Sequence, residues 1–344
     1  MSAAQEAVPG RTASEVLGWS RALLDPALRA AVRGLPPETR RVAEYHFGWR
    51  DEQGRPAEGS GGKAIRPALT LLAARAVGGD PADALPAAVA VELAHNFSLL
   101  HDDVMDGDLT RRHQATAWSV FGVNAAILAG DALIALAYET LADGPVSREG
   151  LRALSRAVVD LVEGQSIDMA FERRTDVSLA ECEAMAAGKT GALLGGACAL
   201  GASCGGGDAA QVARLRAFGE LLGLAFQVVD DLLGIWGDPA VTGKPVHSDL
   251  VNRKKSLPVV AALTSGTAAG AALAELYRGE GPLTGSGPAR AAELIGLAGG
   301  RDWGEARAAE LLDAALTELD AATPDPVAAA DLHTLATLVT ARDH

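Results

Sequence analysis

Three aspartates close an apolar stretch of the sequence, in VELAHNFSLLHDDVMDGD. On a helix, residues i and i+4 share a face, so Asp102 and Asp106 project together, with Asp103 beside them. Like charges at this spacing repel and also oppose the helix dipole, so they are costly without a compensating cation. Carboxylate oxygens suit Mg²⁺, which takes a few protein carboxylates together with phosphate oxygens and water. The alternative interpretation is a solvated helix end that binds nothing.

A second acidic cluster occurs later, in FQVVDDLLGIWGD. Asp230 and Asp231 again follow an apolar run, and Asp238 comes further on. The residue four positions after Asp230 is Gly234, which carries no carboxylate. Two such segments in one chain predict helices that face each other across a bundle and bind a shared metal cluster, as carboxylate helices do in other bundles. Two unrelated acidic helix ends are the alternative.

Cationic residues lie beside both acidic clusters. They are Lys63 and Arg66 in GGKAIRP, Arg111 and Arg112 after the first cluster, Lys189 in GKT, and Lys244 and Lys254 after the second. A single Lys or Arg in a loop is usually a solvated charge, so the signal is their shared placement. Lys, bidentate Arg and backbone N–H groups near glycine are the groups that bind diphosphates. GGK is not a P-loop, because the GxxxxGK[ST] pattern and a preceding strand are both missing.

Composition bounds the class of protein. Of 344 residues, 49% are apolar and only 4% aromatic, a mix that favours helices over strands. The net charge of −14 argues against a general nucleic-acid binder. An odd count of three cysteines without metal-ligand spacing favours reduced thiols in a cytoplasmic protein. Residues 190–206 and 256–275 are not convincing membrane spans and the start has no signal core, so we expect no integral membrane protein.

Helix-compatible segments follow one another from near Ser14 to the end of the chain. A polar loop at 51–62 interrupts them, as do Gly, Pro or Asp clusters at 78–85, 107–109, 143–147, 173–177, 203–208, 279–288 and 322–326. No alternating strand pattern of useful length occurs. We therefore predict an all-α helical bundle that forms a single domain over residues 13–344, preceded by a disordered segment at residues 1–12.

The motifs in this order resemble the trans-isoprenyl diphosphate synthases, or polyprenyl synthetases, and most of all the geranylgeranyl diphosphate synthase type. The matching segments are GGKAIRP, ELAHNFSLLHDDVMDGDLTRR, GKT, FQVVDDLLG and GKPVHSDLVNRKKSLP. The resemblance implies an isoprenoid synthase-type bundle around a central apolar cavity, a homodimer, and dependence on Mg²⁺, with Mn²⁺ as the alternative ion. The implied reaction condenses isopentenyl diphosphate with dimethylallyl, geranyl or farnesyl diphosphate.

The resemblance also implies a role for each matching residue. The metal ligands would be Asp102, Asp103 and Asp106 in the first motif and Asp230 in the second, with Asp231 and Asp238 in support. The ligands of the allylic diphosphate would be Arg111, Lys189 and Lys244, with Lys254 close by. The isopentenyl diphosphate pocket would comprise Lys63, Arg66, His95 and Arg112. Thr190 and Gln227 are similar to the polar residues that steady the allylic cation and orient the substrate.

Product length would depend on two residues before the first motif. Ser98 lies one helical turn from Asp102 on the same face and is small, whereas Phe97 beside it could partly block an apolar channel. A single aromatic here, with no insertion in DDxxD, resembles the geranylgeranyl-forming type. We expect a C20 product, with C15 farnesyl diphosphate as the runner-up. The plainer interpretation of Phe97 is an ordinary core aromatic.

Two positions depart from the family's usual pattern. Ala64 follows GGK where the family usually has Arg, and Gly234 ends the second motif where the family usually has Asp. These departures leave open a non-catalytic subunit or cargo protein. A class I terpene cyclase on the same scaffold is a further alternative. A cyclase would not need an isopentenyl pocket, however, and the sequence contains no N-D-x-x-S-x-x-x-E pattern.

Overall fold

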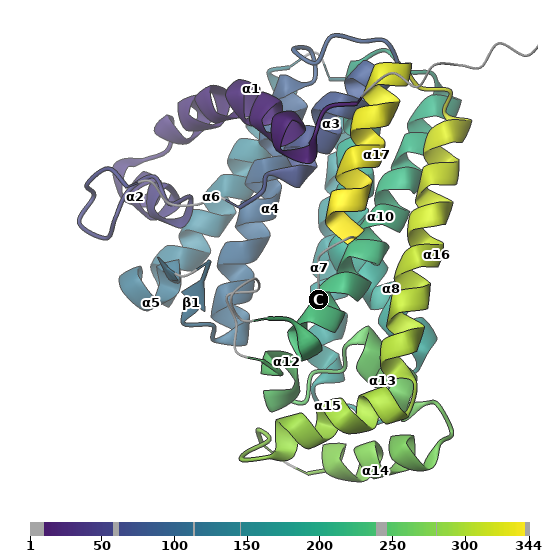
Figure 1. Cartoon of the computed structure of the whole chain (residues 1–344). Coiled ribbons are helices and arrows are strands. Elements are labelled where there is room, and N and C mark those ends of the chain that lie inside the picture. The colour runs from purple at the N-terminus through teal and green to yellow at the C-terminus, as the bar shows by residue number, and fades with distance from the viewer. Residues whose placement is uncertain are drawn as a thin grey trace, which may run out of the picture. The chain divides into compact units, whose positions relative to one another are not determined.

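The protein is built almost entirely of helices (Figure 1). The computed structural model describes residues 10–57, 62–112, 114–144, 146–238, 246–279 and 281–340. Within these ranges the only named strands form one antiparallel hairpin, β1 (Thr110–Arg111) with β2 (Gln114–Ala115). The predicted all-α fold is therefore confirmed.

The helix boundaries agree with the breaks predicted from the sequence. The helices are α1 (Ala13–Arg33), α2 (Pro37–His46), α3 (Ile65–Ala76), α4 (Leu85–Asp106), α5 (Ala117–Phe121), α6 (Val123–Ala142), α7 (Arg148–Phe171), α8 (Leu179–Ala186), the π-helix η1 (Ala187–Gly191), α9 (Ala192–Cys204), α10 (Ala209–Trp236), α12 (Ser248–Val251), α13 (Leu257–Leu263), α14 (Ala268–Tyr277), α15 (Gly287–Leu297), α16 (Gly300–Ala321) and α17 (Pro326–Thr340). Other breaks were not predicted, among them those that separate α10, α12, α13 and α14 from one another. The break between α1 and α2 was also missed: it falls at Gly34 and the prolines after it, because proline has no backbone N–H to continue a helix.

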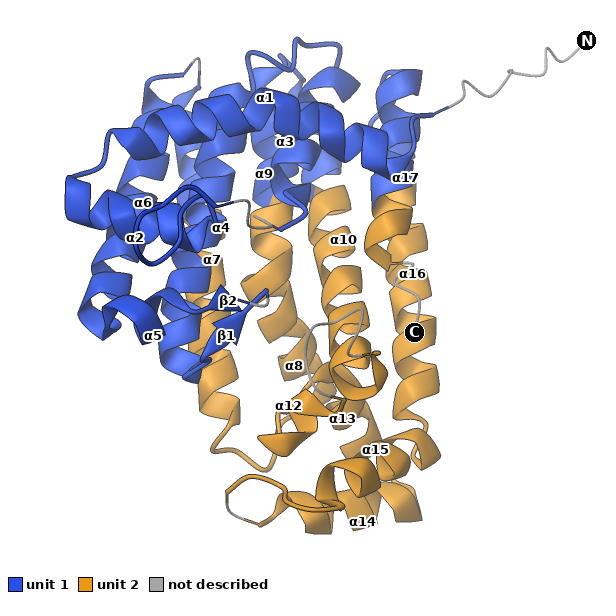
Figure 2. Ribbon diagram, turned by 60° about the vertical axis from the view of Figure 1, so that its left-hand side comes forward, with its two compact units in different colours: residues 1–155, 196–216, 319–335 blue, residues 156–195, 217–318, 336–344 orange. Residues whose placement is uncertain are grey.

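The chain divides into two compact units (Figure 2). Unit 1 comprises residues 1–155, 196–216 and 319–335, and unit 2 comprises residues 156–195, 217–318 and 336–344. The boundaries fall within helices α7, α9, α10, α16 and α17. The single domain predicted for residues 13–344 stays a prediction.

In unit 1 the central element is α4, which packs against α3 and α6. Pro86 lies in its first turn, where a missing N–H costs nothing. Its middle buries Val91 and Leu93 completely. The helix ends at Gly107, which adopts a left-handed conformation that glycine tolerates best. The first acidic cluster therefore occupies the last turn of a buried helix.

The start of the described chain is fixed by a buried ion pair in unit 1. Arg11 Nη2 lies 2.7 Å from Asp331 Oδ2, and the Asp331 side chain is fully buried. Thr12 and Glu15 then form a capping box at the start of α1. Arg11 and Thr12 thus make defined contacts, and the prediction of disorder for residues 1–12 stays a prediction. Residues 1–9 lie outside the described residues.

In unit 2 the second acidic cluster lies on α10. Apolar residues of this helix, including Val228 and Leu232, share a core with Leu257 of α13 and Leu311 of α16. The helices α14 and α15 pack side by side (Figure 1). The core thus fixes α10 against the start of α13, and the site below depends on that contact.

One helix in the described part of the chain, α6, is long and apolar enough to cross a membrane, with a mean hydropathy of 1.5. The pair α13 and α14, which overlaps the apolar stretch 256–275, passes the same test only as one span and is bent by 116°. Core helices of globular proteins meet these criteria too. The expectation of no integral membrane protein stays a prediction.

Candidate active site

The first acidic cluster presents its three carboxylates differently. Asp103 is 1% exposed, and its Oδ1 accepts a hydrogen bond of 2.6 Å from Arg111 Nε. Burial raises the pKa of Asp103, and the charge of Arg111 opposes that rise. Asp106 is exposed and Asp102 is half-buried. Asp103 therefore positions Arg111, while the i, i+4 pair Asp102 and Asp106 presents the carboxylates of this motif to solvent.

The β1–β2 hairpin positions the two arginines after this cluster. Arg111 lies in β1, and Arg112 occupies the turn with a φ of 51°. Thr116 Oγ1 and Trp118 Nε1 each donate a 2.8 Å hydrogen bond to the carbonyl of Asp108. These bonds fix the chain between the aspartates and the hairpin, so the two guanidinium groups have defined places near α4.

A second group of cations gathers around the middle of α4. Arg66 Nη1 lies 3.2 Å from His95 Nε2. Burial lowers the pKa of Arg66 to about 10, and burial with the nearby arginines lowers the pKa of His95 well below its ordinary value. His95 is therefore neutral at physiological pH, and its ring nitrogen can accept a hydrogen bond from Arg66.

A buried carboxylate balances this positive charge. Glu92 is 4% exposed, and burial raises its pKa, whereas Arg66, Arg112 and Arg21 act to lower it. Its Oε1 accepts a 3.0 Å bond from Asn96. Three guanidinium groups thus share one buried anion and carry surplus positive charge, which suits a diphosphate.

The GGK loop adjoins the same cations. Gly62 has a φ of 74°, and a Cβ there would lie only 2.5 Å from Arg112 Nη2. Arg21 donates a hydrogen bond to the Gly62 carbonyl. Ala64 itself has a left-handed φ of 50° directly before α3. The structure therefore brings this loop, with the exposed Lys63, to Arg112, and the residues predicted for the isopentenyl pocket share one region of unit 1.

In unit 2, Lys189 is fixed by an ion pair that the sequence did not reveal. Its Nζ lies 2.6 Å from Asp168 Oδ2 of α7. Lys189 and Thr190 lie in η1, a π-helical turn between α8 and α9; such turns are frequent at functional sites. Close packing of Gly164 on the Lys189 backbone brings α7 to this turn.

A chain of hydrogen bonds runs from η1 through α10 to α13. Thr190 Oγ1 donates to Gln227 Oε1 at 2.6 Å, and Gln227 Nε2 donates to Asp231 Oδ1 at 2.8 Å. Asp231 Oδ2 accepts from the Leu257 N–H at 2.9 Å. Burial raises the pKa of Asp231 to about 7, against the opposing effect of Lys254. Both oxygens of Asp231 are thus engaged within the protein, which favours a positioning role over direct metal binding.

Four carboxylates of unit 2 lie around Lys254. Asp230 is exposed, and Asp238 lies just beyond the end of α10. Burial lowers the pKa of Lys254, but four carboxylates outweigh this effect and raise it above its ordinary value: Asp249, Asp231, Asp168 and Asp230. Lys244 lies outside the described residues.

Gly234 leaves room for a carboxylate from elsewhere in the chain. A Cβ at this position would lie 2.3 Å from Asp249 Oδ2, so the Asp249 side chain occupies the space beside it. Within the described ranges, no group of three or more His, Cys, Asp or Glu side chains is arranged to hold a metal ion. The two acidic clusters lie in different units, and their predicted convergence stays a prediction.

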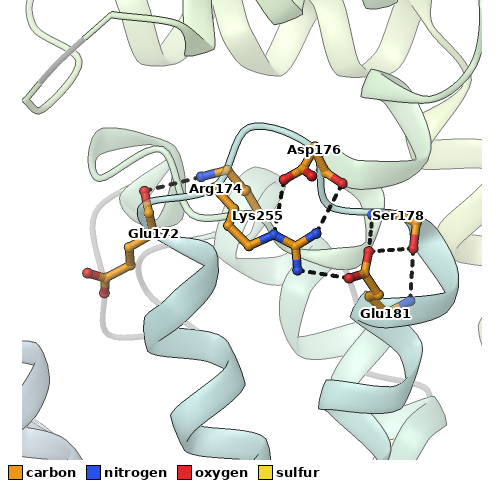
Figure 3. Close-up of polar contacts among 6 residues, drawn as sticks. All are labelled: Glu172, Arg174, Asp176, Ser178, Glu181 and Lys255. Atoms are coloured by element: carbon orange, nitrogen blue, oxygen red, sulfur yellow. Dashed lines mark hydrogen bonds and ion pairs between the residues drawn. The ribbon is translucent and has the colours of Figure 1, made fainter.

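The loop between α7 and α8 is fixed by charge pairs (Figure 3). Arg174 lies 3.0 Å from Asp176 and 2.8 Å from Glu181, and Glu181 caps α8 together with Ser178. Lys255 Nζ donates to the carbonyl of Glu172 at 3.4 Å. This contact joins the segment after Lys254 to the end of α7, the helix that carries Asp168.

The sequence analysis did not predict several polar residues that lie near these sites. They are Arg21, His46, Glu92, Asn96, Gln165 and Asp168. Gln165 is 5% exposed, and neither of its amide atoms has a hydrogen-bond partner among the described residues. The spacing of Gln165 and Asp168 in GQSIDMA, on one face of α7, was the available signal. The other four residues lie in segments with the pattern of an ordinary amphipathic helix, which gives no signal of a functional site.

Phe97 and Ser98, the two residues expected to limit product length, point to different sides of α4. Phe97 packs edge-on against His101, with ring centroids 4.9 Å apart. His101 Nε2 in turn lies 3.0 Å from the carbonyl of Ile127 in α6. Ser98 is 6% exposed, and its hydroxyl donates to the carbonyl of His95. The Phe97 ring is therefore held on the α6 side of α4, about 100° around the helix from Ser98.

The chain matches one protein family and several known members of it. The polyprenyl synthetase profile matches residues 55–286. The chain is 51% identical to a (2E,6E)-farnesyl diphosphate synthase of Mycobacterium tuberculosis over 85% of this chain and 83% of the relative. It is 47% identical to a geranylgeranyl diphosphate synthase of the same organism over 98% of this chain and 96% of the relative.

Solved structures of proteins from the same family resemble this chain over nearly its whole length. A polyprenyl synthetase from Streptomyces coelicolor A3(2) superimposes with a TM-score of 0.90 at 47% identity, covering 95% of this chain and 99% of that one. A geranylgeranyl pyrophosphate synthase from Corynebacterium glutamicum, complexed with isoprenyl diphosphate and magnesium, gives a TM-score of 0.79 at 27% identity, covering 96% and 98%.

Proposed function

Because the chain belongs to the polyprenyl synthetase family and is a short-chain trans-isoprenyl diphosphate synthase, we propose that its main product is geranylgeranyl diphosphate. The observation that carries this choice is the small, buried Ser98 one turn before Asp102, with the Phe97 ring turned toward α6. The geranylgeranyl diphosphate synthase relative, matched over 98% of the chain, supports it.

Farnesyl diphosphate is the second candidate product, because the relative of that activity is 51% identical. These relatives do not favour the terpene cyclase or non-catalytic alternatives. The substrates are isopentenyl diphosphate and an allylic diphosphate, as the family implies. A cytoplasmic location and the use of Mn²⁺ stay predictions.

The family binds Mg²⁺, and the exposed carboxylates fit that ion. Asp102 and Asp106 on α4 would hold Mg²⁺ in unit 1, and Asp230 on α10 would hold Mg²⁺ in unit 2, because this ion prefers a few carboxylates plus phosphate oxygens. Asp103 and Asp231 act as positioning residues, since each is buried and bonded within the protein. Bound Mg²⁺ would neutralise charge on the diphosphate leaving group.

The chain's own residues supply the remaining chemistry. Arg111 and Lys189, each held by an aspartate, bind the allylic diphosphate and stabilise the charge that it gains as the C–O bond ionises. In this proposal Thr190 and Gln227, which are hydrogen-bonded to each other, steady the allylic cation. Lys244 and Lys254 add positive charge in this proposal. In this proposal the predicted apolar cavity excludes water from the cation.

Isopentenyl diphosphate binds at the cation cluster of unit 1. Lys63, Arg66 and Arg112 contact its diphosphate, with His95 hydrogen-bonded to Arg66. This fixes the double bond for attack on the allylic C1, and positioning of this kind contributes much of the rate. The new bond leaves a tertiary cation, which loses a proton to the released diphosphate.

Product analysis tests the proposal directly. The purified protein is incubated with isopentenyl diphosphate and Mg²⁺ in separate reactions with dimethylallyl, geranyl or farnesyl diphosphate, and the products are dephosphorylated and separated by chain length. We expect mainly C20. Mainly C15 would contradict the product assignment, and no elongation of any primer by folded protein would contradict the activity.

A Ser98→Phe variant tests the residue that carries the assignment. A phenyl ring one turn before Asp102 should shorten the product toward C15, because it fills the space that the growing chain needs. The matched control is Ser98→Ala, which removes the hydroxyl but keeps the space and should leave the product at C20. An unchanged distribution in Ser98→Phe would refute the role of Ser98.

A further inference from the structure

A small cavity in unit 1 borders the inner side of the first acidic cluster. Its volume is about 20 Å³, and its lining includes His46 of α2, Asp103 of α4, and Arg111 and Arg112 of the hairpin. A cavity needs at least about 10–15 Å³ on this measure to contain one water molecule. The space therefore fits a single water and is too small for a substrate.

Two buried polar atoms at this cavity lack a hydrogen-bond partner among the described residues. They are Asp103 Oδ2 and His46 Nε2. Asp103 is 1% exposed, and its other oxygen is engaged by Arg111. An unpaired buried carboxylate oxygen costs free energy, and a water molecule with two to four polar contacts removes that cost.

The chemistry of the lining groups assigns the direction of each hydrogen bond. The carboxylate of Asp103 can only accept, so a water must donate to it. Burial lowers the pKa of His46 to about 3, so its ring is neutral at physiological pH. Asn96 lies beside this ring; its Nδ2 donates to Glu92, and its Oδ1 has no hydrogen-bond partner among the described residues. In the tautomer that carries its proton on Nδ1, His46 Nε2 is an acceptor.

We propose that one buried water molecule bridges His46 Nε2 and Asp103 Oδ2, and that His46 thereby positions the Asp103–Arg111 pair. The water donates one hydrogen to each of these atoms and accepts from a guanidinium of the lining. His46 is a positioning residue that acts through Asp103 on Arg111. The consequence for the allylic diphosphate rests on the proposed function.

The bridge also joins the two cation groups of unit 1. Glu92, which lies among Arg66 and Arg112, bonds Asn96; Asn96 lies beside His46; and the water leads from His46 to Asp103. A continuous polar connection therefore runs along α4 from the isopentenyl region to Arg111. Without the water, this connection ends at His46.

The first test is structural and does not depend on activity. A crystal structure of the full chain that resolves ordered waters should show one, within hydrogen-bond distance of both His46 Nε2 and Asp103 Oδ2. A dry cavity, or a water that contacts only one of the two atoms, would overturn the proposal. This result stands even if the wild-type protein made no prenyl diphosphate, an outcome that would remove the proposed function alone.

The second test separates positioning from general stability. His46→Phe removes the acceptor and should raise the KM for the allylic diphosphate roughly two- to tenfold, the equivalent of one hydrogen bond, with a smaller change in the KM for isopentenyl diphosphate. His46→Gln keeps a polar side chain of similar reach and should restore most of the effect. The control is His333→Phe, on an exposed face of α17, which should behave as wild type.

Equal loss in His46→Phe and His46→Gln, or a fall in melting temperature with both KM values unchanged, would overturn the positioning role. A structure of His46→Phe should also lack the water. If the water persists there with unchanged contacts to Asp103, His46 is not part of the bridge.

Discussion

Gly164 on α7 should control the position of Lys189, so replacing it with alanine is a sharp test of the site in unit 2. A Cβ at this position would lie 2.3 Å from the Lys189 backbone nitrogen and 2.8 Å from its Cα. Ordinary van der Waals contact begins at 3.4 Å. Because the obstacle is backbone and not a flexible side chain, η1 has to move away by about 1 Å.

This displacement should affect activity more than stability. Overpacking costs about 1–3 kcal/mol, and the better helix propensity of alanine returns about 1 kcal/mol, so the net loss of unfolding free energy is about 0–2 kcal/mol. A misplacement of about 1 Å in a catalytic group, however, can reduce the rate about a hundredfold. The 2.6 Å ion pair between Lys189 and Asp168 would be distorted by the same movement.

The assay is steady-state elongation with both substrates, combined with urea unfolding of the same preparations. Gly164→Ala should lower kcat on the order of 10- to 100-fold while the protein remains folded. The matched control is Gly18→Ala in the middle of α1, where a Cβ meets nothing within 4 Å. This control should keep full activity and gain up to about 1 kcal/mol of stability. Wild-type kcat in Gly164→Ala would refute the reasoning.

Three further predictions concern stability, pH and assembly. Arg11→Ala should lower the unfolding free energy by about 3 kcal/mol, because it leaves the fully buried Asp331 uncompensated; a urea-denaturation change below about 1 kcal/mol would contradict this. His46 has a pKa near 6.5 in the unfolded chain and about 3 in the folded one, so the unfolded chain binds more protons between these values. The unfolding free energy should therefore fall as pH drops from about 6.5 toward 3, by up to about 1.4 kcal/mol per pH unit. In urea unfolding, His46→Gln should show a smaller fall over the same range. Equal slopes of unfolding free energy against pH in the two proteins would contradict the burial of a neutral ring. The exposed apolar residues of α6, including Leu128 at 63%, should be covered by a second copy of the chain, so light scattering should give a dimer for wild type and a monomer for Leu128→Glu; a wild-type monomer would contradict this assembly.

Local sequence determined the helices and where they end. Gly, Pro and Asp clusters interrupt apolar periodicity, and these signals act within a few residues, so eight of the breaks between helices could be predicted, whereas those between α10 and α14 could not. The spacing of Asp102 and Asp106 likewise fixes a shared helix face wherever the helix lies. The capping box at Thr12 is local too, but the contact of Arg11 with Asp331, far along the chain, was not predicted.

Only the tertiary structure decided which carboxylates are exposed and which are engaged. The sequence does not distinguish Asp103 and Asp231 from the aspartates next to them. In the structure both are buried: Asp103 is hydrogen-bonded to Arg111. Asp231 is hydrogen-bonded to Gln227 and Leu257. Asp168 was invisible as the partner of Lys189 because the two residues lie on different helices. Spacing along a helix sets the direction of a side chain, whereas burial and pairing depend on what other helices bring to that side, and that information is not local.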